Sequence, residues 1–343
     1  MSSEVNKVYS RILIVEVNWL GDVLFSTPFI RAVRERFKAS HIACMLLPRT
    51  KEILENNPNI DEIIIYDEKG THRGILGKLG IIKLLKDKKF DLAILLHRSL
   101  TRTLITIFAG IPQRAGYVTR KRKRFLTLPI EPPGGPTHKV DYFLGIARFF
   151  GCETSGKDYE FFIRKRDREY VKTELAKSGL GETDRIVVIN AGGNWAPKRW
   201  QEEKFAKLGD MLIGKYGVKI VLSGSDNDTG MASRICRMMS SKAVSFAGKT
   251  GLRELGALME RALVVISGDS GPMHIACAMK SKVIALFGPT SPDITGPHGP
   301  GQYKILHKPD RCKVPCYDFS CKASRCMDSI TVEDVMNAFK ELI

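Results

Sequence analysis

The chain has 343 residues, of which 43% are hydrophobic and 27% charged, which is ordinary for a soluble globular protein. This length favours two domains over one. The formal charge of +17, from 54 Lys and Arg against 37 Asp and Glu, indicates an acidic partner: nucleic acid, an anionic membrane surface or a phosphorylated substrate. No run approaches the roughly 18 apolar residues of a membrane span, and the N-terminus lacks the apolar core of a signal peptide, so we expect a cytoplasmic protein.

The first element is a buried-type strand over 11–17, followed by a short loop and an amphipathic helix over 23–37. Gly21 permits a tight turn, and Asp22 is placed at the start of the helix. As an N-cap, Asp22 needs no further function. Alternatively, it displays a carboxylate at the carboxyl end of the strand, where an acceptor could approach it.

Further α/β winding follows. The pattern predicts strands over 41–47, 62–66 and 92–96, and helices over 51–56, 75–86 and 138–150. His97 and Arg98 follow the strand that ends at residue 96, and five consecutive cations run from Arg120 through Arg122 to Arg124. Such a run is either a solvated loop or a contact for an acidic acceptor or an anionic membrane. No aromatic stacking pattern accompanies it, which argues against nucleic acid.

The pattern restarts after a boundary expected near residue 165. A strand over 185–190 leads into a Gly-rich loop that contains Gly193 and Asn194. Lys198 follows with Arg199, between two tryptophans, where cations could neutralise a diphosphate; a surface pair beside packing tryptophans is the alternative. The next strand, 218–223, runs into Asp226. Two successive α/β halves imply a ligand cleft between domains.

The stretch 262–292 reads as strand, loop, helix and strand, a parallel βαβ unit whose first loop holds Asp269, Ser270 and Gly271. Amides at the start of this helix would favour phosphate, and His274 lies one turn beyond Ser270. In the plainer interpretation, Asp269 and Ser270 cap the helix and His274 is a core histidine. A hydrolase that uses Ser270 with His274 is a further alternative, although the sequence around them does not fit a nucleophile elbow.

Four cysteines gather near the C-terminus: Cys312, Cys316, Cys321 and Cys326. Four thiolates can satisfy zinc or an iron–sulfur cluster, but the spacing lacks paired C-x-x-C knuckles. We expect no metal site, with reduced or locally disulfide-bonded thiols as the alternative to a metal cluster.

Several of these stretches together resemble glycosyltransferase family 9, the ADP-heptose:lipopolysaccharide heptosyltransferases, and in particular the heptosyltransferase II-like branch. The stretches are RILIVEVNWLGDVLFSTPFIRAVR, GGNWAPKRWQEEKFAKL, VLSGSDND, LRELGALMERALVVISGDSGPMHIACAMKSKVIALFGPTSPDITGPHG and the tail that runs into ITVEDVMNAF. They cover nearly the whole length in the family's order, and GDSGPMHIA is the most specific of them.

The resemblance implies an α/β GT-B fold of two Rossmann-like domains facing across a cleft. It places an acceptor domain at 1–165, a nucleotide-sugar domain at 166–328 and a C-terminal helix at 329–343 that packs across the domain junction. The implied reaction is an inverting, metal-independent transfer of heptose from ADP-heptose, in the form of ADP-L-glycero-D-manno-heptose, to an acidic lipopolysaccharide inner-core acceptor, with no cofactor.

By motif match, Asp22 is the expected general base and Lys198 contacts the donor phosphates. The expected donor-binding residues are Gly193, Asn194, Lys198, Asp226, Asp269, Ser270, Gly271 and His274, with Asp228 an alternative to Asp226 as the ribose acid. The expected acceptor-binding residues are Gly21, His97, Arg98, Arg120 and Arg122.

We further expect an acidic lipid-linked glycan as acceptor, peripheral contact with the cytoplasmic face of an anionic inner membrane, no nucleic acid and a monomer. The alternatives are a related glycosyltransferase with another nucleotide sugar or glycan acceptor, and a non-catalytic nucleotide-sugar-binding protein.

Overall fold

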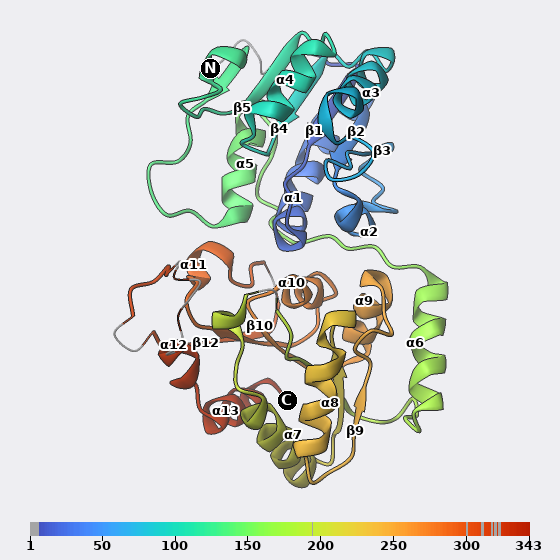
Figure 1. Ribbon diagram of the computed structural model, residues 1–343, viewed down its shortest axis with the longest axis vertical. Helices are drawn as coiled ribbons and strands as arrows, with labels where there is room; N and C mark the ends of the chain where they lie inside the picture. The colour runs from blue at the N-terminus through green and yellow to red at the C-terminus, as the bar shows by residue number, and fades with distance from the viewer. Residues whose placement is uncertain are drawn as a thin grey trace. The chain divides into compact units, whose positions relative to one another are not determined.

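The computed structural model describes residues 7–193, 195–299, 301–309, 312–316, 318, 321 and 324–343. The chain divides into two compact units between Phe162 and Ile163, close to the boundary expected after residue 165. Each unit is a parallel α/β sandwich and is described by itself (Figure 1).

The first unit is built on a six-stranded parallel sheet in the order β3-β2-β1-β4-β5-β6. Its strands are β1 (Arg11–Val15), β2 (His41–Leu46), β3 (Glu62–Ile65), β4 (Leu92–Leu95), β5 (Gln113–Tyr117) and β6 (Leu128–Ile130). Its helices are α1 (Leu20–Arg36), α2 (Lys51–Leu54), α3 (Gly74–Asp87), α4 (Leu100–Phe108) and α5 (Lys139–Phe149), with 3₁₀ turns η2 (Pro48–Thr50) and η3 (Lys123–Phe125).

Both faces of this sheet are covered, which is why its central strands are almost continuously apolar. All residues of β4 and all but the first of β1 are buried. Helix α1 packs against α5, and α3 packs against α4 (Figure 1). Ile81 and Leu85 of α3 join a core cluster with Leu13 and Val15 of β1.

The second unit repeats the plan with the order β12-β11-β10-β7-β8-β9. Its strands are β7 (Ile186–Asn190), β8 (Lys219–Ser223), β9 (Ala243–Ser245), β10 (Val264–Gly268), β11 (Val283–Phe287) and β12 (Tyr303–His307). Its helices are α6 (Lys165–Lys177), α7 (Glu202–Tyr216), α8 (Thr229–Met238), α9 (Leu252–Arg261), α10 (Gly271–Ala278), α11 (Pro292–Thr295), α12 (Arg325–Asp328) and α13 (Val332–Leu342), with turns η4 (Ala196–Lys198) and η5 (Asp226–Asp228).

Counted from its own first strand, each unit has the strand order 3-2-1-4-5-6 of a Rossmann fold, so the two units share one topology. The C-terminal helix α13 begins with a capping box in which Thr331 and Asp334 accept each other's backbone amides. It packs on α7, β11 and β12 of its own unit, and its buried Phe339 belongs to that unit's core. That this helix also crosses the domain junction stays a prediction.

Candidate functional site

Each sheet has a topological switch point, where neighbouring strands send their connections in opposite directions. The switch lies between β1 and β4 in the first unit and between β7 and β10 in the second. In such sheets ligands bind outside the carboxyl ends of the strands at this point. His97, Gly193 and Asp269 lie in the loops after β4, β7 and β10, and Asp22 lies in the first turn of the helix after β1. The sequence-predicted residues therefore gather at the two places where this fold binds ligands.

Asp22 occupies the first turn of α1, as its third residue, and is half-buried. The expectation that Asp22 is the N-cap is wrong, because Trp19 holds that position. Gly21 is the second helical residue, so it makes no left-handed turn. A carboxylate in the first turn is favoured by the positive end of the helix dipole. The first turn of α1 thus presents the Asp22 side chain at the carboxyl edge of the sheet.

A second carboxyl group, which the sequence did not single out, lies inside the same loop. Glu16 directly follows β1 and is fully buried, and the Ser26 hydroxyl lies 3.1 Å from each of its carboxyl oxygens. Burial raises the pKa of Glu16 to about 8, and the negative charge of Asp22 adds to this, while Ser26, the Val17 amide and Arg102 oppose it. Glu16 is thus a protonated acid at neutral pH, close to Asp22.

Arg102 of α4 holds this loop from inside the fold. Its guanidinium is 2% exposed and donates to the Glu16 carbonyl at 2.7 Å and to Asn18 Oδ1 at 2.6 Å. On the outer side, Arg49 donates to the Asn18 carbonyl at 2.9 Å and lies 4.9 Å from the ring centre of Trp19. The Trp19 side chain is 59% exposed. A fixed cation therefore stands over an exposed indole, three residues before Asp22.

The loop after β4 carries His97 and Arg98. The amide of Ser99 donates to His97 Nδ1 at 3.0 Å, and burial together with Arg102 lowers the pKa of His97 to about 4. His97 is therefore neutral at physiological pH, with its proton on Nε2. Arg98 is exposed, as is Arg120 of the cationic run. His97, Arg98 and Arg120 can therefore donate hydrogen bonds to an acceptor substrate.

Arg122 corrects a prediction. It is fully buried, and it donates from Nε to the Tyr117 carbonyl at 2.9 Å and from Nη1 to the His97 carbonyl at 2.6 Å. Burial lowers its pKa to about 10. Arg122 therefore supports the backbone at His97 and is not displayed for an acceptor. The sequence pattern could not separate it from its neighbours, because one buried position within a run of cations leaves no signal.

In the second unit the centre of the site is the Asp269 carboxylate, whose side chain is 5% exposed. Lys198 Nζ lies 2.6 Å from Asp269 Oδ2, and Thr290 Oγ1 donates to the same oxygen at 2.7 Å. His274 Nε2 lies 3.9 Å from Oδ1. Three segments that are distant in the sequence thus converge on one acid. Thr290 is not among the residues predicted from the sequence. Its position in the loop after β11, beside β10, is the signal that could have identified it as a site residue.

Neither polar residue at the start of α10 acts as a cap. Ser270 holds the N-cap position without a side-chain cap hydrogen bond, and its hydroxyl lies 3.1 Å from that of Ser267. The Asp269 carboxylate is engaged by Lys198 and Thr290. The first amides of α10 are therefore not capped by these side chains. This arrangement favours an anion site over simple helix capping.

A Gly-rich turn adjoins this acid. Gly193 is half-buried, and its carbonyl accepts from Arg199 Nε at 2.7 Å; Asn194 lies outside the described residues. A Cβ on Gly192 would come within 2.7 Å of the Asp228 carboxyl carbon. Asp228 itself accepts from the amide and hydroxyl of Ser225. Asp226, in contrast, is exposed, so it is the better placed of the two acids to bind a ligand.

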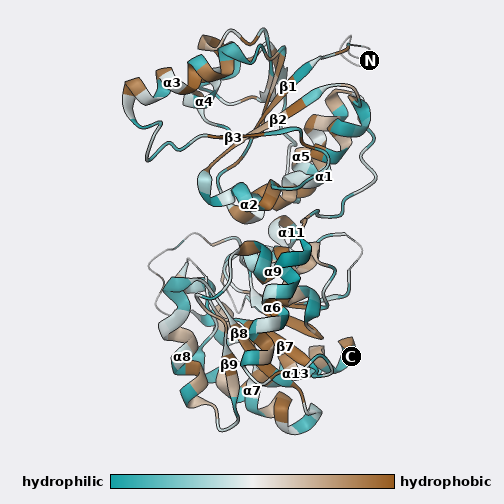
Figure 2. Ribbon diagram, turned by 90° about the vertical axis from the view of Figure 1, so that its right-hand side faces the viewer, coloured by the Kyte–Doolittle hydropathy of each residue, from teal (hydrophilic) through white to brown (hydrophobic). Residues whose placement is uncertain are grey.

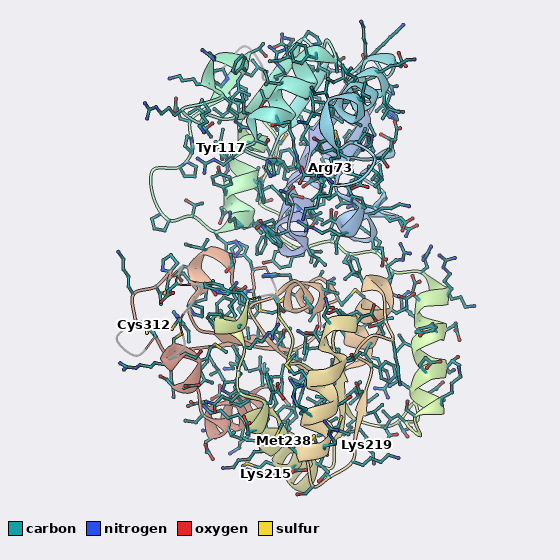
Figure 3. All side chains as sticks on the ribbon, in the orientation of Figure 1. Arg73, Tyr117, Lys215, Lys219, Met238 and Cys312 are labelled. Atoms are coloured by element: carbon teal, nitrogen blue, oxygen red, sulfur yellow. The ribbon has the colours of Figure 1, made fainter. Side chains whose placement is uncertain are left out.

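The cysteine cluster is made of free thiols: Cys312, Cys316, Cys321 and Cys326. The Cys316 amide donates to the Pro289 carbonyl at 2.7 Å, which places this segment beside the loop after β11 (Figure 3 labels Cys312). Burial raises the pKa of Cys326, and Cys312 and Cys321 add to the shift. Among the described residues, no group of three or more His, Cys, Asp or Glu is arranged to hold a metal ion.

Two Rossmann-like units with candidate sites at their switch points have the architecture of the α/β GT-B fold. A family model for glycosyltransferase family 9 (heptosyltransferase) matches residues 79–326. Lipopolysaccharide heptosyltransferase 3 of Escherichia coli K12 is 32% identical over 284 residues, 79% of this chain and 80% of the relative. Lipopolysaccharide heptosyltransferase 2 of the same strain is 26% identical over 307 residues, 84% and 85% of the two chains.

The crystal structure of a family 9 glycosyltransferase from Veillonella parvula has a TM-score of 0.91 and 28% identity, and the match covers 98% of both chains. The chain belongs to glycosyltransferase family 9 and is a glycosyltransferase. In the part of the chain that the structure describes, no helix is long and apolar enough to cross a bilayer.

Proposed function

We propose that this enzyme transfers heptose from ADP-heptose to an acidic, lipid-linked inner-core acceptor of lipopolysaccharide, with inversion at the anomeric carbon and without a metal ion. The observation that carries the proposal is the convergence of Lys198 and Thr290 on the buried Asp269, at the start of α10. The printed names of the relatives, lipopolysaccharide heptosyltransferases 2 and 3, support the choice of sugar and acceptor.

On the donor side, the two halves of a nucleotide sugar match two neighbouring groups. Asp269 accepts hydrogen bonds from sugar hydroxyls. Lys198 has three N–H donors, of which one is directed at Asp269, so the others remain for the diphosphate. The free N–H groups in the first turn of α10, those of Gly271 and Met273 since Pro272 has none, add positive potential. Gly193 and Ser270 line the same loops, and Asp226 takes the ribose hydroxyls.

On the acceptor side, Asp22 acts as general base. As the acceptor hydroxyl oxygen bonds to the anomeric carbon, its proton passes to Asp22, and the bond from that carbon to the diphosphate oxygen breaks. The electron pair leaves with ADP, and Lys198 stabilises the negative charge that develops there. This cation and the helix amides supply what a metal ion supplies elsewhere, which is why we propose a metal-independent reaction.

Acidic groups of the acceptor would bind the cations at the carboxyl edge of the first sheet. Arg98 and Arg120 are exposed, and Arg49 stands over the Trp19 indole, so a sugar ring could stack there while its carboxylate or phosphate meets the guanidinium. We also propose that the enzyme acts as a monomer in the cytoplasm, in peripheral contact with the inner membrane.

The test is product formation from ADP-heptose and a deacylated, 3-deoxy-octulosonate-containing acceptor, with GDP- and UDP-sugars as alternative donors. Heptosyl product whose anomeric configuration is opposite to that of the donor, formed in the presence of a chelator, supports the donor, the acceptor, the inversion and the metal independence. Transfer from a different donor would refute heptose as the transferred sugar, and the assignment as a glycosyltransferase would stand. Donor binding without turnover on any acceptor would indicate a nucleotide-sugar-binding protein instead.

A further inference from the structure

Exposed apolar side chains concentrate on α3. Ile75 is 79% exposed, Leu76 83%, Leu79 54% and Leu84 42%. Single exposed apolar residues are common on soluble proteins and need no explanation. Several on one helix form a contiguous patch, and such patches mark surfaces that bind something.

The fold does not need these side chains. Helix α3 already has a buried side, through Ile81 and Leu85, which belong to the core cluster of the first unit. The residues at 75, 76 and 79 lie on the opposite, outward side. Figure 2 shows that α3 contains both hydrophobic and hydrophilic residues. The outward apolar residues are therefore additional to those that fix the helix on the sheet.

The same outward side carries cations. Lys83 is four residues after Leu79 and seven after Leu76, and Lys86 is seven after Leu79, so these lysines share a face with the apolar residues. Both lysines are exposed. The stretch 69–86 contains five cations and no acidic residue: Lys69, Arg73, Lys78, Lys83 and Lys86 (Figure 3 labels Arg73). The last residue of α3, Asp87, is acidic and exposed, so the helix carries three lysines against one acid. An apolar face beside an excess of cations is typical of helices that lie in a membrane interface.

We propose that the outward face of α3 docks on an anionic lipid bilayer. The helix lies in the plane of the interface, Ile75, Leu76 and Leu79 enter the boundary between headgroups and acyl chains, and Lys83 and Lys86 contact lipid phosphates. A second copy of the chain is a poorer occupant, because self-association through this face would place its cations against the same cations.

This surface has a direct relation to the site. In a parallel sheet, the helix after a strand begins at the carboxyl edge, so the apolar first half of α3, which follows β3, starts at the edge that carries Asp22. Docking would hold that edge beside the bilayer surface. This last step rests on the proposed function, since it assumes a lipid-linked acceptor.

The experiment is cosedimentation of the full chain with vesicles of phosphatidylethanolamine and phosphatidylglycerol, and with phosphatidylcholine vesicles as the neutral comparison. We compare wild type with the triple variant Ile75→Ser, Leu76→Ser, Leu79→Ser and with the double variant Lys83→Gln, Lys86→Gln. A matched apolar control replaces Tyr170, Met238 and Ile305 by Ser, which are 41%, 42% and 36% exposed in the second unit. A matched charge control replaces Lys215 and Lys219, two exposed lysines of the second unit, by Gln.

Wild type should bind the anionic vesicles, and more weakly at high salt. The lysine double variant should lose roughly twenty-five-fold in partitioning, about five-fold per cation, and the apolar triple variant more than roughly ten-fold. Both control variants should bind as wild type does. Unchanged circular dichroism and thermal midpoint would show that the variants fold. Equal binding by the α3 variants and wild type, or a wild type that ignores anionic vesicles, overturns the proposal.

Turnover separates this proposal from the proposed function. With a vesicle-embedded acceptor, the α3 variants should transfer sugar more slowly than wild type, and with the deacylated acceptor at the same rate. If wild type turns over neither acceptor yet binds vesicles through α3, the proposed heptosyl transfer is refuted and the proposed docking surface is supported. An altered oligomeric state of the triple variant in light scattering, with no vesicle binding by wild type, would assign the face to a second copy instead.

Discussion

The ammonium group of Lys198 and the carboxylate of Asp269 lie 2.6 Å apart, although 71 residues separate them in the chain. The Asp269 side chain is 5% exposed and that of Lys198 is 23% exposed, so the pair bridges the interior and the surface of the second unit. A buried carboxylate is costly without a partner. Removing the Lys198 side chain should therefore change two quantities, the stability of the second unit and its affinity for the donor.

Replacing Lys198 by Ala should lower the affinity for ADP by about ten- to a hundred-fold, because a charge-assisted contact to phosphate is lost. It should also destabilise the second unit by about 1–3 kcal/mol, since Asp269 keeps only part of its compensation. Calorimetric titration with ADP and denaturant unfolding measure the two effects. Lys207→Ala, at an exposed lysine of α7, is the control and should change neither. Undiminished ADP affinity in Lys198→Ala would remove its phosphate role.

Thr290→Val keeps the shape of the side chain and removes the donor to Asp269. One hydrogen bond to a charged acceptor is worth about 1.5–3 kcal/mol, so the orientation of Asp269 should suffer and the KM for the donor should rise about ten-fold or more. Steady-state kinetics with varied nucleotide sugar give this value. The control is Thr295→Val, whose hydroxyl contacts only a backbone carbonyl among its recorded bonds. A donor KM equal to that of wild type would mean that Lys198 alone orients Asp269.

The central strands of both sheets were predictable because they are buried on both faces. Buried apolar runs predicted β1, β2, β4, β7, β8, β10 and β11, and the structure has a strand at each. The edge strands β6, β9 and β12 and the interior strand β5 were missed. β6 and β9 have three residues each and β6 contains Pro129, which reads as a loop, while β5 has no continuous apolar run because it contains Gln113, Arg114 and Gly116. The sequence of α6 indicates only a charged stretch at the domain boundary and no helix, because its buried residues are few and widely spaced.

The candidate site residues were predictable where they lie together in one loop motif. They were not predictable where the fold brings them together from separate segments. Asp269 and Ser270 lie in one such motif. Thr290 and Glu16 act through contacts that only the strand order creates, and burial decides their chemistry. Arg122 is the opposite case. Its residue type predicts an exposed cation, but its buried guanidinium donates to the His97 backbone carbonyl. Residue type and spacing therefore give candidates, and burial assigns the roles.

Asp22→Asn should lower kcat by about a hundred- to ten-thousand-fold, which is the usual contribution of a general base. Donor affinity should stay unchanged, because the donor residues belong to the other unit. The control is Asp141→Asn, which removes an acid from the first turn of α5 in the same unit. Its effect reports any general cost of losing a first-turn carboxylate, about 0.3–1 kcal/mol. Turnover by Asp22→Asn within a few-fold of wild type would require another base.

Glu16→Gln tests the buried acid behind that base. The pKa of Glu16 rises from 4.5 to about 8 on folding, so the folded chain holds a proton that the unfolded chain releases between these values. Its stabilising contribution is therefore complete below the unfolded pKa and is lost as pH rises through the folded pKa. The size of this loss is of the order of a few kcal/mol.

Gln has no such proton, yet its amide oxygen can still accept from Ser26. Denaturant midpoints measured between about pH 5 and pH 9 should thus fall more steeply for wild type than for Glu16→Gln, whose advantage grows toward alkaline pH. Glu131→Gln, at an exposed carboxylate, should follow wild type. Parallel curves for wild type and Glu16→Gln would mean that Glu16 is ionised in the folded chain. In that case Arg102 would outweigh burial, and Asp22 would work beside a second negative charge.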